Sequence, residues 1–334
     1  MSTTVNILMT CIGRRVSLLQ SFRRALAELG LGGRIYGSDW SRLTPAFYVT
    51  DESFLVPGIN APEYVDVLLD ICRQHDVGLV IPLLDPELLI LARARERFAQ
   101  AGARLVLSSL RVVEICRDKL KTFQFLRDHG LGTPRVLSPD EALGGPFPLV
   151  VKERRGSSAR NVRRVHHAGM LKFARRSKID FIIQEYVPGV EFTVDVYADF
   201  TGRPRVAVPR QRLQVRTGEV TKARTVRDPD VIRDAFRLVE ALGECVGVIT
   251  AQCRRTPKGE VKFFDINPRF GGGVPLAIRA GADFPKWILQ EHLGQTPSID
   301  PEAWENGLLM LRYDAEVFHR LDEAAEADES VGAP

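Results

Sequence analysis

The sequence predicts an α/β domain with a parallel sheet, followed by a region of α+β type. Up to about Leu107, short apolar strands alternate with amphipathic helices through short connections. Parallel strands need crossover connections that are usually helical, so this alternation indicates a parallel sheet with helices on both faces. From about Cys116, strands follow one another through turns, which indicates antiparallel pairing.

Each element of the first region has its own signal. In the first predicted helix, apolar residues recur at Leu18, Leu19, Phe22 and Leu26, the spacing of one helical face. The predicted strands cover residues 5–10, 34–39, 79–82 and 104–107, and the helices cover 17–29, 64–75 and 88–101.

The first strand ends in a turn at Gly13, and Asp39 ends the second, an arrangement found in dinucleotide-binding proteins. The turn lacks the Gly-x-Gly-x-x-Gly spacing that lets a backbone approach a pyrophosphate. We therefore do not expect NAD to bind here.

The second region begins with a helix over 118–129, closed by Gly130. A helix over 228–246 and an antiparallel pair around Pro257-Lys258-Gly259 are expected later, and a further helix runs from 285 to 293. The acidic tail beyond Asp314 is expected to begin as a helix and then to fray. The remaining expected strands cover 147–153, 181–186, 191–199 and 205–212.

Composition narrows the class of protein. Of the 334 residues, 45% are hydrophobic and 26% are charged, which is ordinary for a globular protein. No apolar run approaches the length of a membrane span, and the first residues do not resemble a signal peptide, so we expect a cytoplasmic protein. The five cysteines are scattered without a Cys-x-x-Cys pair, which argues against disulfides and zinc. The net charge of +4 comes from dispersed arginines, so neither nucleic acid nor a membrane is an expected partner.

An apolar strand that ends in Lys152 is the first candidate for phosphate chemistry. The turn Gly156-Ser157-Ser158 follows it closely, so backbone N–H groups and hydroxyls could hold phosphate oxygens beside a fixed ammonium group. The lysine precedes the glycine, so this is not the common phosphate-binding loop. A surface hairpin is the alternative interpretation.

A connection between two strands is the second candidate. The segment Gln184-Glu185-Tyr186-Val187 leads into Pro188-Gly189 and offers backbone groups that could pair with the edge of adenine. Glu191 follows as a candidate carboxylate for ribose hydroxyls. An ordinary turn with a solvated Glu191 is the alternative.

The third candidate is Asp265-Ile266-Asn267-Pro268-Arg269. Strand alternation puts Asp265 and Asn267 on one face, where their oxygens suit Mg²⁺. Gln252, on the strand expected to pair with this one, could add a third oxygen. Arg269 would stand beside the metal and stabilise a transferring phosphoryl group. A polar strand end capped by proline is the alternative.

Taken in this order, the segments resemble the ATP-grasp superfamily, specifically its carboxylate–amine ligase and carbamoyl-phosphate-synthase-like branch. The resemblance implies a Rossmann-like domain over 1–115, an ATP-grasp domain over 116–312 and an acidic tail over 313–334. The ATP-grasp domain would divide into a small subdomain, about 120–187, and a large one, about 188–312.

The same resemblance implies roles for individual residues. Lys119 and Lys152 would contact the phosphates, Gly156, Ser157 and Ser158 would belong to the loop above them, and Gln252, Asp265 and Asn267 would hold the metal. Arg269, Lys222 and Arg216 would be catalytic, and Gly271 and Gly272 would lie on the substrate side. The sequence departs from the family where Ser158 and Asn161 replace glycines, where Gln252 replaces an acid, and where Asp265 replaces the longer Glu.

The expected function is therefore ATP-dependent activation of a small carboxylate as an acyl phosphate, followed by ligation to an amine. The expected cofactors are ATP and one or two Mg²⁺ ions, with Mn²⁺ as an alternative. Glu87 follows a strand end, where open α/β sheets bind ligands, and is a candidate for the substrate site. The alternatives are an enzyme that makes carbamoyl or carboxy phosphate from bicarbonate, and an inactive ATP-binding module. The oligomeric state is left open, with a homodimer as one candidate because dimers are the commonest soluble assembly.

Overall fold

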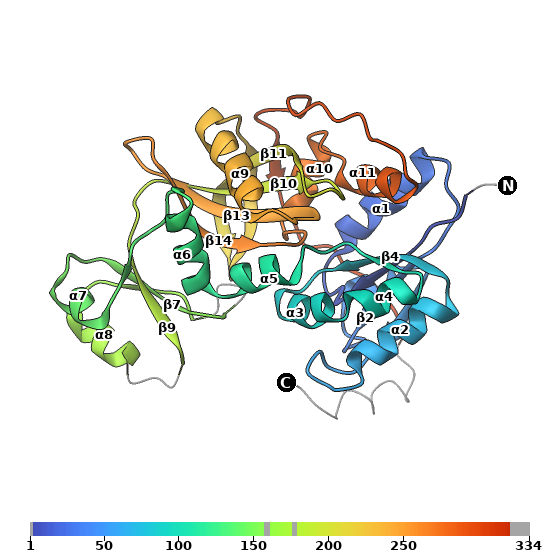
Figure 1. Cartoon of the computed structure of the whole chain (residues 1–334), viewed down its shortest axis with the longest axis horizontal. Coiled ribbons are helices and arrows are strands. Elements are labelled where there is room, and N and C mark those ends of the chain that lie inside the picture. Colours follow the sequence, from blue (N-terminus) through green and yellow to red (C-terminus); the bar gives the residue numbers. More distant parts are fainter. Residues whose placement is uncertain (1–2, 157–160, 176–178, 321–334) are drawn as a thin grey trace. The chain divides into compact units, whose positions relative to one another are not determined.

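The computed structural model describes residues 3–156, 161–175 and 179–320 of the chain. It divides into two compact units (Figure 1). The first comprises Met1–Leu110, Asp283–Ser298 and Tyr313–Pro334, and the second comprises Arg111–Ala282 and Ile299–Arg312. The expected division at 115/116 differs in two respects. The first unit ends slightly earlier, and it also includes a later helix, α11 (Phe284–His292), which contacts α1 (Val16–Glu28).

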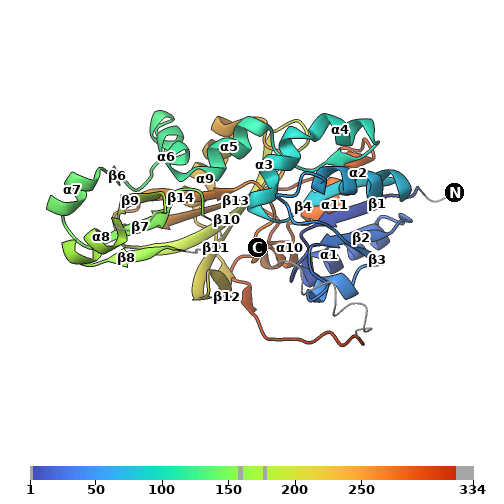
Figure 2. The same ribbon diagram turned by 90° about the horizontal axis from the view of Figure 1, so that it is seen from below.

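The first unit is built on a parallel five-stranded sheet in the order β3-β2-β1-β4-β5. Helix α1 lies on one face of the sheet and α2, α3 and α4 on the other (Figure 2). Strand order reverses between β1 and β4, and such a reversal is where open sheets commonly bind ligands. The remaining elements are β1 (Asn6–Thr10), β2 (Ile35–Asp39), η1 (Pro45–Tyr48), β3 (Glu52–Leu55), α2 (Tyr64–Gln74), β4 (Val77–Pro82), α3 (Asp85–Arg93), α4 (Arg95–Gln100) and β5 (Arg104–Leu105).

The second unit begins with α5 (Leu110–Arg117) and α6 (Lys119–Asp128) and then forms a four-stranded sheet in the order β6-β9-β7-β8. All pairs in this sheet are antiparallel. Its own core includes Leu149 and Val151 on β7 and Leu171 on α8. The remaining elements are β6 (Val136–Leu137), α7 (Pro139–Gly144), β7 (Leu149–Glu153), β8 (Arg163–Val165), α8 (Ala168–Arg175) and β9 (Phe181–Glu185).

The rest of the second unit is a larger antiparallel sheet in the order β14-β13-β10-β11-β12-β15. Helices α5, α6 and α9 pack side chains against it, including Leu126 and Leu238, which are both fully buried. Helix α10 packs Leu276 against Val220 and Ala223 of β12. The elements are β10 (Val190–Ala198), β11 (Pro204–Arg216), β12 (Glu219–Thr225), α9 (Pro229–Leu242), β13 (Gly247–Arg255), β14 (Val261–Asn267), α10 (Val274–Arg279) and β15 (Leu309–Leu311).

These sheets confirm the predicted fold class, a parallel-sheet domain followed by two antiparallel sheets. Two local expectations were wrong. The helix expected over 88–101 is interrupted at Ala94, which separates α3 from α4. Residues 314–320 form no helix, although the tail was expected to begin as one. No helix in the described ranges is long and apolar enough to cross a membrane.

Candidate active site

The site is built around the end of β14. Asp265 and Asn267 lie on one face of this strand, while Ile266 between them is buried in the core on the other face. Gln252 of β13 pairs directly with Asp265, so its side chain shares that face. The predicted grouping of these three residues is therefore present in the structure.

Two lysines from other elements approach Asp265. Lys119 is the first residue of α6, and its Nζ lies 3.6 Å from Asp265 Oδ1. Lys152 of β7 is only 4% exposed, and its Nζ donates a hydrogen bond of 2.7 Å to the carbonyl oxygen of Phe264, the residue before Asp265. Helix α6 and strand β7 thus bring two ammonium groups to one carboxylate on β14.

The two lysines change the acidity of the group they surround. Burial by itself would raise the pKa of Asp265, but the charges of Lys119 and Lys152, with the Asn267 hydrogen bond and the charge of Arg269, hold this pKa below its usual value. For Lys152, burial lowers the pKa to about 8, although the charge of Asp265 works in the opposite direction. Asp265 is therefore ionised at neutral pH, and Lys152 is a cation that can lose its proton in mildly alkaline solution.

The donor set fits a Mg²⁺ ion that is shared with phosphates. Asn267 donates a hydrogen bond of 3.1 Å to Asp265 Oδ2, so the two side chains lie together. No group of three His, Cys, Asp or Glu side chains within the described ranges could hold a metal ion. Mg²⁺ commonly takes one or two carboxylates and completes its shell with phosphates and water. One carboxylate with two amide oxygens suits that mode of binding.

The predicted hinge connects the two sheets of the second unit. Gln184 and Val187 are buried, and Glu185 Oε1 forms an ion pair with Lys262 Nζ at 3.1 Å. The Tyr186 ring lies 3.9 Å from the guanidinium carbon of Arg164. At Gly189, φ is +139° and a Cβ would overlap the carbonyl of Arg255, so the turn requires glycine.

Glu191 is held by two arginines that sequence reasoning missed. Arg212 Nε lies 3.2 Å from Glu191 Oε1, and Arg254 Nη2 donates a hydrogen bond of 2.6 Å to Oε2. Burial lowers the pKa of Arg212, while the charges of Glu191 and Asp265 raise it. Arg212 thus adds a third cation to this region. Its signal in the sequence is its alternation with Arg210 along β11, on a strand that pairs with the strand of Glu191.

The turn after β14 carries Arg269 and the glycine run. Thr250 Oγ1 lies within hydrogen-bonding distance of both the Arg269 carbonyl, at 3.0 Å, and Asp195 Oδ1, at 3.1 Å. A Cβ at Gly271 would lie 2.8 Å from the Thr250 side chain, and Arg312 donates to the carbonyl of Gly272. The charge of Arg269 contributes to the lowered pKa of Asp265. The turn is therefore packed closely, with Arg269 on the side of Asp265.

Some predicted residues are not brought to this group. Arg216 and Lys222 are exposed around the turn between β11 and β12. Strand β12 is four positions from β14 in the sheet, about 19 Å at about 4.8 Å per strand. Their catalytic role stays a prediction. Gly156 accepts a hydrogen bond of 2.8 Å from Lys119 Nζ, whereas Ser157 and Ser158 lie outside the described residues.

Glu87 in the first unit is fully buried and accepts hydrogen bonds from groups of the same unit. Tyr64 OH donates to its Oε2 at 2.8 Å, and the N–H groups of Leu83 and Leu84 donate to its Oε1 at 3.0 Å. Burial raises its pKa. These contacts tie the start of α3 to α2, and the substrate role of Glu87 stays a prediction. Asp39, considered above for a dinucleotide, accepts a hydrogen bond of 2.9 Å from the Gly13 N–H.

Comparison with known proteins gives two matches to family models. Residues 7–106 match the PylC-like N-terminal domain, and residues 177–315 match the ATP-grasp domain of a biosynthetic pathway with the Ter operon. A carbamoyl-phosphate synthase from Methanobrevibacter smithii is 24% identical over 155 residues, which are 44% of this chain. The match spans only 41% of that longer protein.

Solved structures show the same fold. The biotin carboxylase domain of 2-oxoglutarate carboxylase from Hydrogenobacter thermophilus, solved with MgADP and bicarbonate, has a TM-score of 0.71 at 15% identity and covers 91% of this chain and 73% of its own. An L-amino acid ligase from Bacillus licheniformis has a TM-score of 0.66 at 21% identity and covers 88% of this chain and 75% of its own. The resemblance to the ATP-grasp superfamily inferred from the motifs is confirmed by the ATP-grasp family model matched over residues 177–315, and the structural neighbours share this fold.

Proposed function

We propose that this protein is an ADP-forming ligase that activates a small carboxylate as an acyl phosphate and joins it to an amine. The observation that carries the proposal is the convergence of Lys119 and Lys152 on Asp265. Two fixed cations next to an ionised carboxylate suit a nucleotide polyphosphate with a shared Mg²⁺ better than they suit a neutral ligand. The L-amino acid ligase among the structural neighbours supports the choice of an amine as the acceptor.

The proposed reaction has two steps. A carboxylate oxygen of the substrate attacks the γ-phosphorus, and the bond between that phosphorus and the β-phosphate oxygen breaks, which releases ADP. The amine nitrogen then attacks the acyl carbon, the bond from that carbon to the phosphate oxygen breaks, and phosphate leaves as the nitrogen loses a proton. Neither step needs a side-chain nucleophile, so catalysis is a matter of holding the reactants and stabilising charge.

The chain supplies the cations for both steps. Lys119 and Lys152 neutralise phosphate oxygens, and Arg269 lies on the same side as Asp265, where it stabilises the transferring group. When bound, Mg²⁺ held by Asp265 with Gln252 and Asn267 would withdraw charge from the phosphates. The hinge, Gln184 to Val187, binds the base, and Glu191 reaches the ribose while Arg212 and Arg254 hold the Glu191 carboxylate.

The test is ADP release by the purified protein with a panel of amino acids, other small acids and amines. Turnover that requires both an acid and an amine, with the ligated product seen by mass spectrometry, supports the proposal. Asp265→Ala is expected to lower turnover at least about 100-fold, the range for loss of a group that stabilises transition-state charge. Undiminished turnover in Asp265→Ala contradicts the metal assignment. Tight MgATP binding without turnover on any substrate points to an ATP-binding module instead.

A second candidate function is formation of carboxy or carbamoyl phosphate from bicarbonate. Two comparisons favour it, the relative named carbamoyl-phosphate synthase and the neighbour solved with bicarbonate. ATP turnover that depends on bicarbonate and needs no organic acid would establish it. The cytoplasmic location stays a prediction, and the homodimer stays one candidate assembly.

A further inference from the structure

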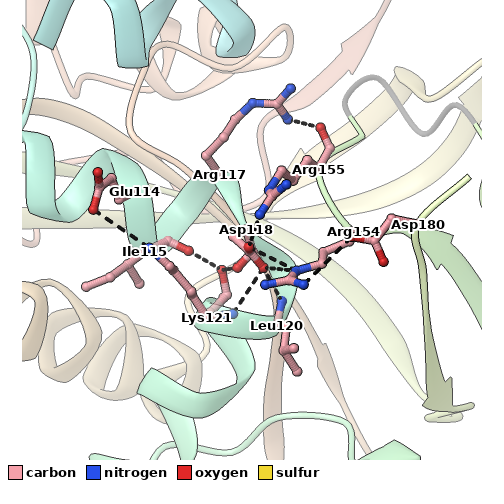
Figure 3. Close-up of polar contacts among 10 residues, drawn as sticks. Glu114, Ile115, Arg117, Asp118, Leu120, Lys121, Arg154, Arg155 and Asp180 are labelled. Atoms are coloured by element: carbon pink, nitrogen blue, oxygen red, sulfur yellow. Dashed lines mark hydrogen bonds and ion pairs between the residues drawn. The ribbon is translucent and has the colours of Figure 1, made fainter. Parts of the chain in front are cut away.

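Asp118, the residue before Lys119, is the centre of a polar network that the proposed chemistry does not use. Figure 3 shows Arg154 and Arg155, from the segment after β7, reaching its carboxylate. Arg154 Nε lies 2.8 Å from Asp118 Oδ1 and 2.9 Å from Oδ2, and Arg155 Nη2 lies 3.4 Å from Oδ2. Asp118 is 3% exposed. Burial by itself would raise the pKa of Asp118. The hydrogen bonds from Arg154 and from backbone N–H groups have the larger combined effect, so this pKa lies below its usual value.

The same carboxylate caps helix α6. The N–H groups of Leu120 and Lys121 donate to Asp118 Oδ1 at 3.0 Å and 3.3 Å. An aspartate at this position satisfies donors that the helix leaves open. Asp118 therefore has two separate functions, as the cap of α6 and as the acceptor for Arg154.

The backbone of the two segments is joined at the same place. The Lys119 N–H donates to the carbonyl of Arg154 at 3.0 Å, and the Arg154 N–H donates to the carbonyl of Asp180 at 2.8 Å. The Lys119 side chain then reaches back to the Gly156 carbonyl at 2.8 Å. The direction of the Lys119 ammonium group thus depends on how residues 154–156 sit on the first turn of α6.

We propose that Asp118 and Arg154 are a positioning pair, which holds residues 154–156 on the first turn of α6 and thereby aims the Lys119 ammonium at Asp265 and at the phosphates of ATP. The inference rests on the proposed function, because it takes phosphate as the ligand of Lys119. The pair touches no reacting atom. It sets nucleotide affinity by removing alternative positions of Lys119 before ATP arrives.

Helix α9 offers a matched control. Its cap, Asp228, accepts hydrogen bonds from the N–H groups of Asp230 and Val231, both at 3.1 Å. Arg255 Nε lies 2.9 Å from Asp228 Oδ2, as Arg154 does from Asp118. Asparagine caps helices about as well as aspartate, so Asp118→Asn and Asp228→Asn each keep the cap and lose the charged partner of an arginine.

The experiment measures equilibrium binding of MgATP and of adenosine by calorimetry, at a temperature where every variant is folded. Asp118→Asn and Arg154→Gln are each expected to weaken MgATP binding about tenfold, the loss of one charge-assisted contact, and to leave adenosine binding unchanged. The double variant is expected to bind MgATP no more weakly than either single variant. Arg154→Lys should restore part of the affinity, and Asp228→Asn should stay within about twofold of the unaltered protein.

Three results would overturn the inference. One is MgATP affinity unchanged in Asp118→Asn. Another is an equal loss for MgATP and adenosine, which means general damage to the second unit. The third is a double variant about a hundredfold weaker, which means that the two residues act independently. Binding is measured without an acid or an amine, so absence of ligase turnover would refute the proposed function and leave this test intact.

Discussion

The lowered pKa of Lys152 predicts that MgATP binding takes up a proton in mildly alkaline solution. The cause is burial, since this side chain is 4% exposed and lies near the charge of Lys119, and Asp265 only partly compensates. Polyphosphate anions beside the ammonium group favour its charged form and raise its pKa in the complex. A fraction of Lys152 that is neutral in the free protein must therefore gain a proton as ATP binds.

The size of this uptake follows from a pKa of about 8 in the free protein. About half of Lys152 is neutral at pH 8 and about one tenth at pH 7, so ATP binding should take up about 0.5 and about 0.1 proton. Stability of the free protein changes in the same window. The pKa falls from 10.5 to about 8 on folding, so the unfolded state binds more protons between these values, and the free energy of unfolding should rise by about 3 kcal/mol as pH increases through them.

The assay is calorimetry of MgATP binding at pH 7 and pH 8 in buffers with different enthalpies of ionisation, which gives the number of protons taken up. Lys152→Met keeps the length of the side chain and removes the titrating group, so its uptake at pH 8 should fall to nearly zero. Lys286→Met, at a half-exposed lysine paired with Glu28 in the first unit, is the control.

An uptake at pH 8 that is the same in Lys152→Met and in the unaltered protein would refute the reasoning. So would the absence of any uptake in the unaltered protein together with tight MgATP binding. The rise in stability between pH 8 and 10.5 should likewise be smaller in Lys152→Met, as measured by urea unfolding.

Two further predictions concern stability. Gly189→Ala should destabilise the protein by about 1–3 kcal/mol in urea unfolding, because a Cβ there overlaps the Arg255 carbonyl and the backbone is left-handed; Gly144→Ala, where a Cβ meets open space, should change little, and equal effects would contradict the packing argument. Burial raises the pKa of Glu87, so the folded state holds the proton more tightly than the unfolded state does. The protonated carboxyl therefore stabilises the fold below about pH 4, and this stabilisation is lost as pH rises through the folded pKa. Glu87→Gln should flatten that pH dependence above about pH 4 in urea unfolding, and an unchanged slope would show that Glu87 is not its source.

Much of the site was predictable because its parts are local. Alternation along one strand puts Asp265 and Asn267 on the same face, whatever lies above them. The short turn around Pro257-Lys258-Gly259 pairs that strand with the one before it, which brings Gln252 opposite Asp265. Side-chain alternation along a strand and the residue preferences of a short turn both act over a few residues. These relations can therefore be predicted from the sequence without knowledge of the fold.

Other relations needed the packed structure. Nothing near Arg154 in the sequence indicates that its side chain would pair with Asp118, which is 36 residues earlier. Nor does the sequence indicate that Arg212 would pair with Glu191. The helix α11 was expected in the ATP-grasp region, yet its contacts are with α1. Long side chains such as arginine can reach several partners, and only the relative placement of distant strands selects one.

The sequence by itself thus determined the resemblance to ATP-grasp proteins, since the order of lysine, turn, hinge and acid-x-Asn carries it, and the proposed chemistry follows from that resemblance. Tertiary structure alone decided which cations meet the carboxylate. Lys152 reaches the backbone next to Asp265 across 112 residues, and Lys119 is aimed through Asp118 and Arg154. The physical reason is that charge acts over a few ångströms in space, and distances on that scale between remote segments are set by the packing of the two sheets and α6.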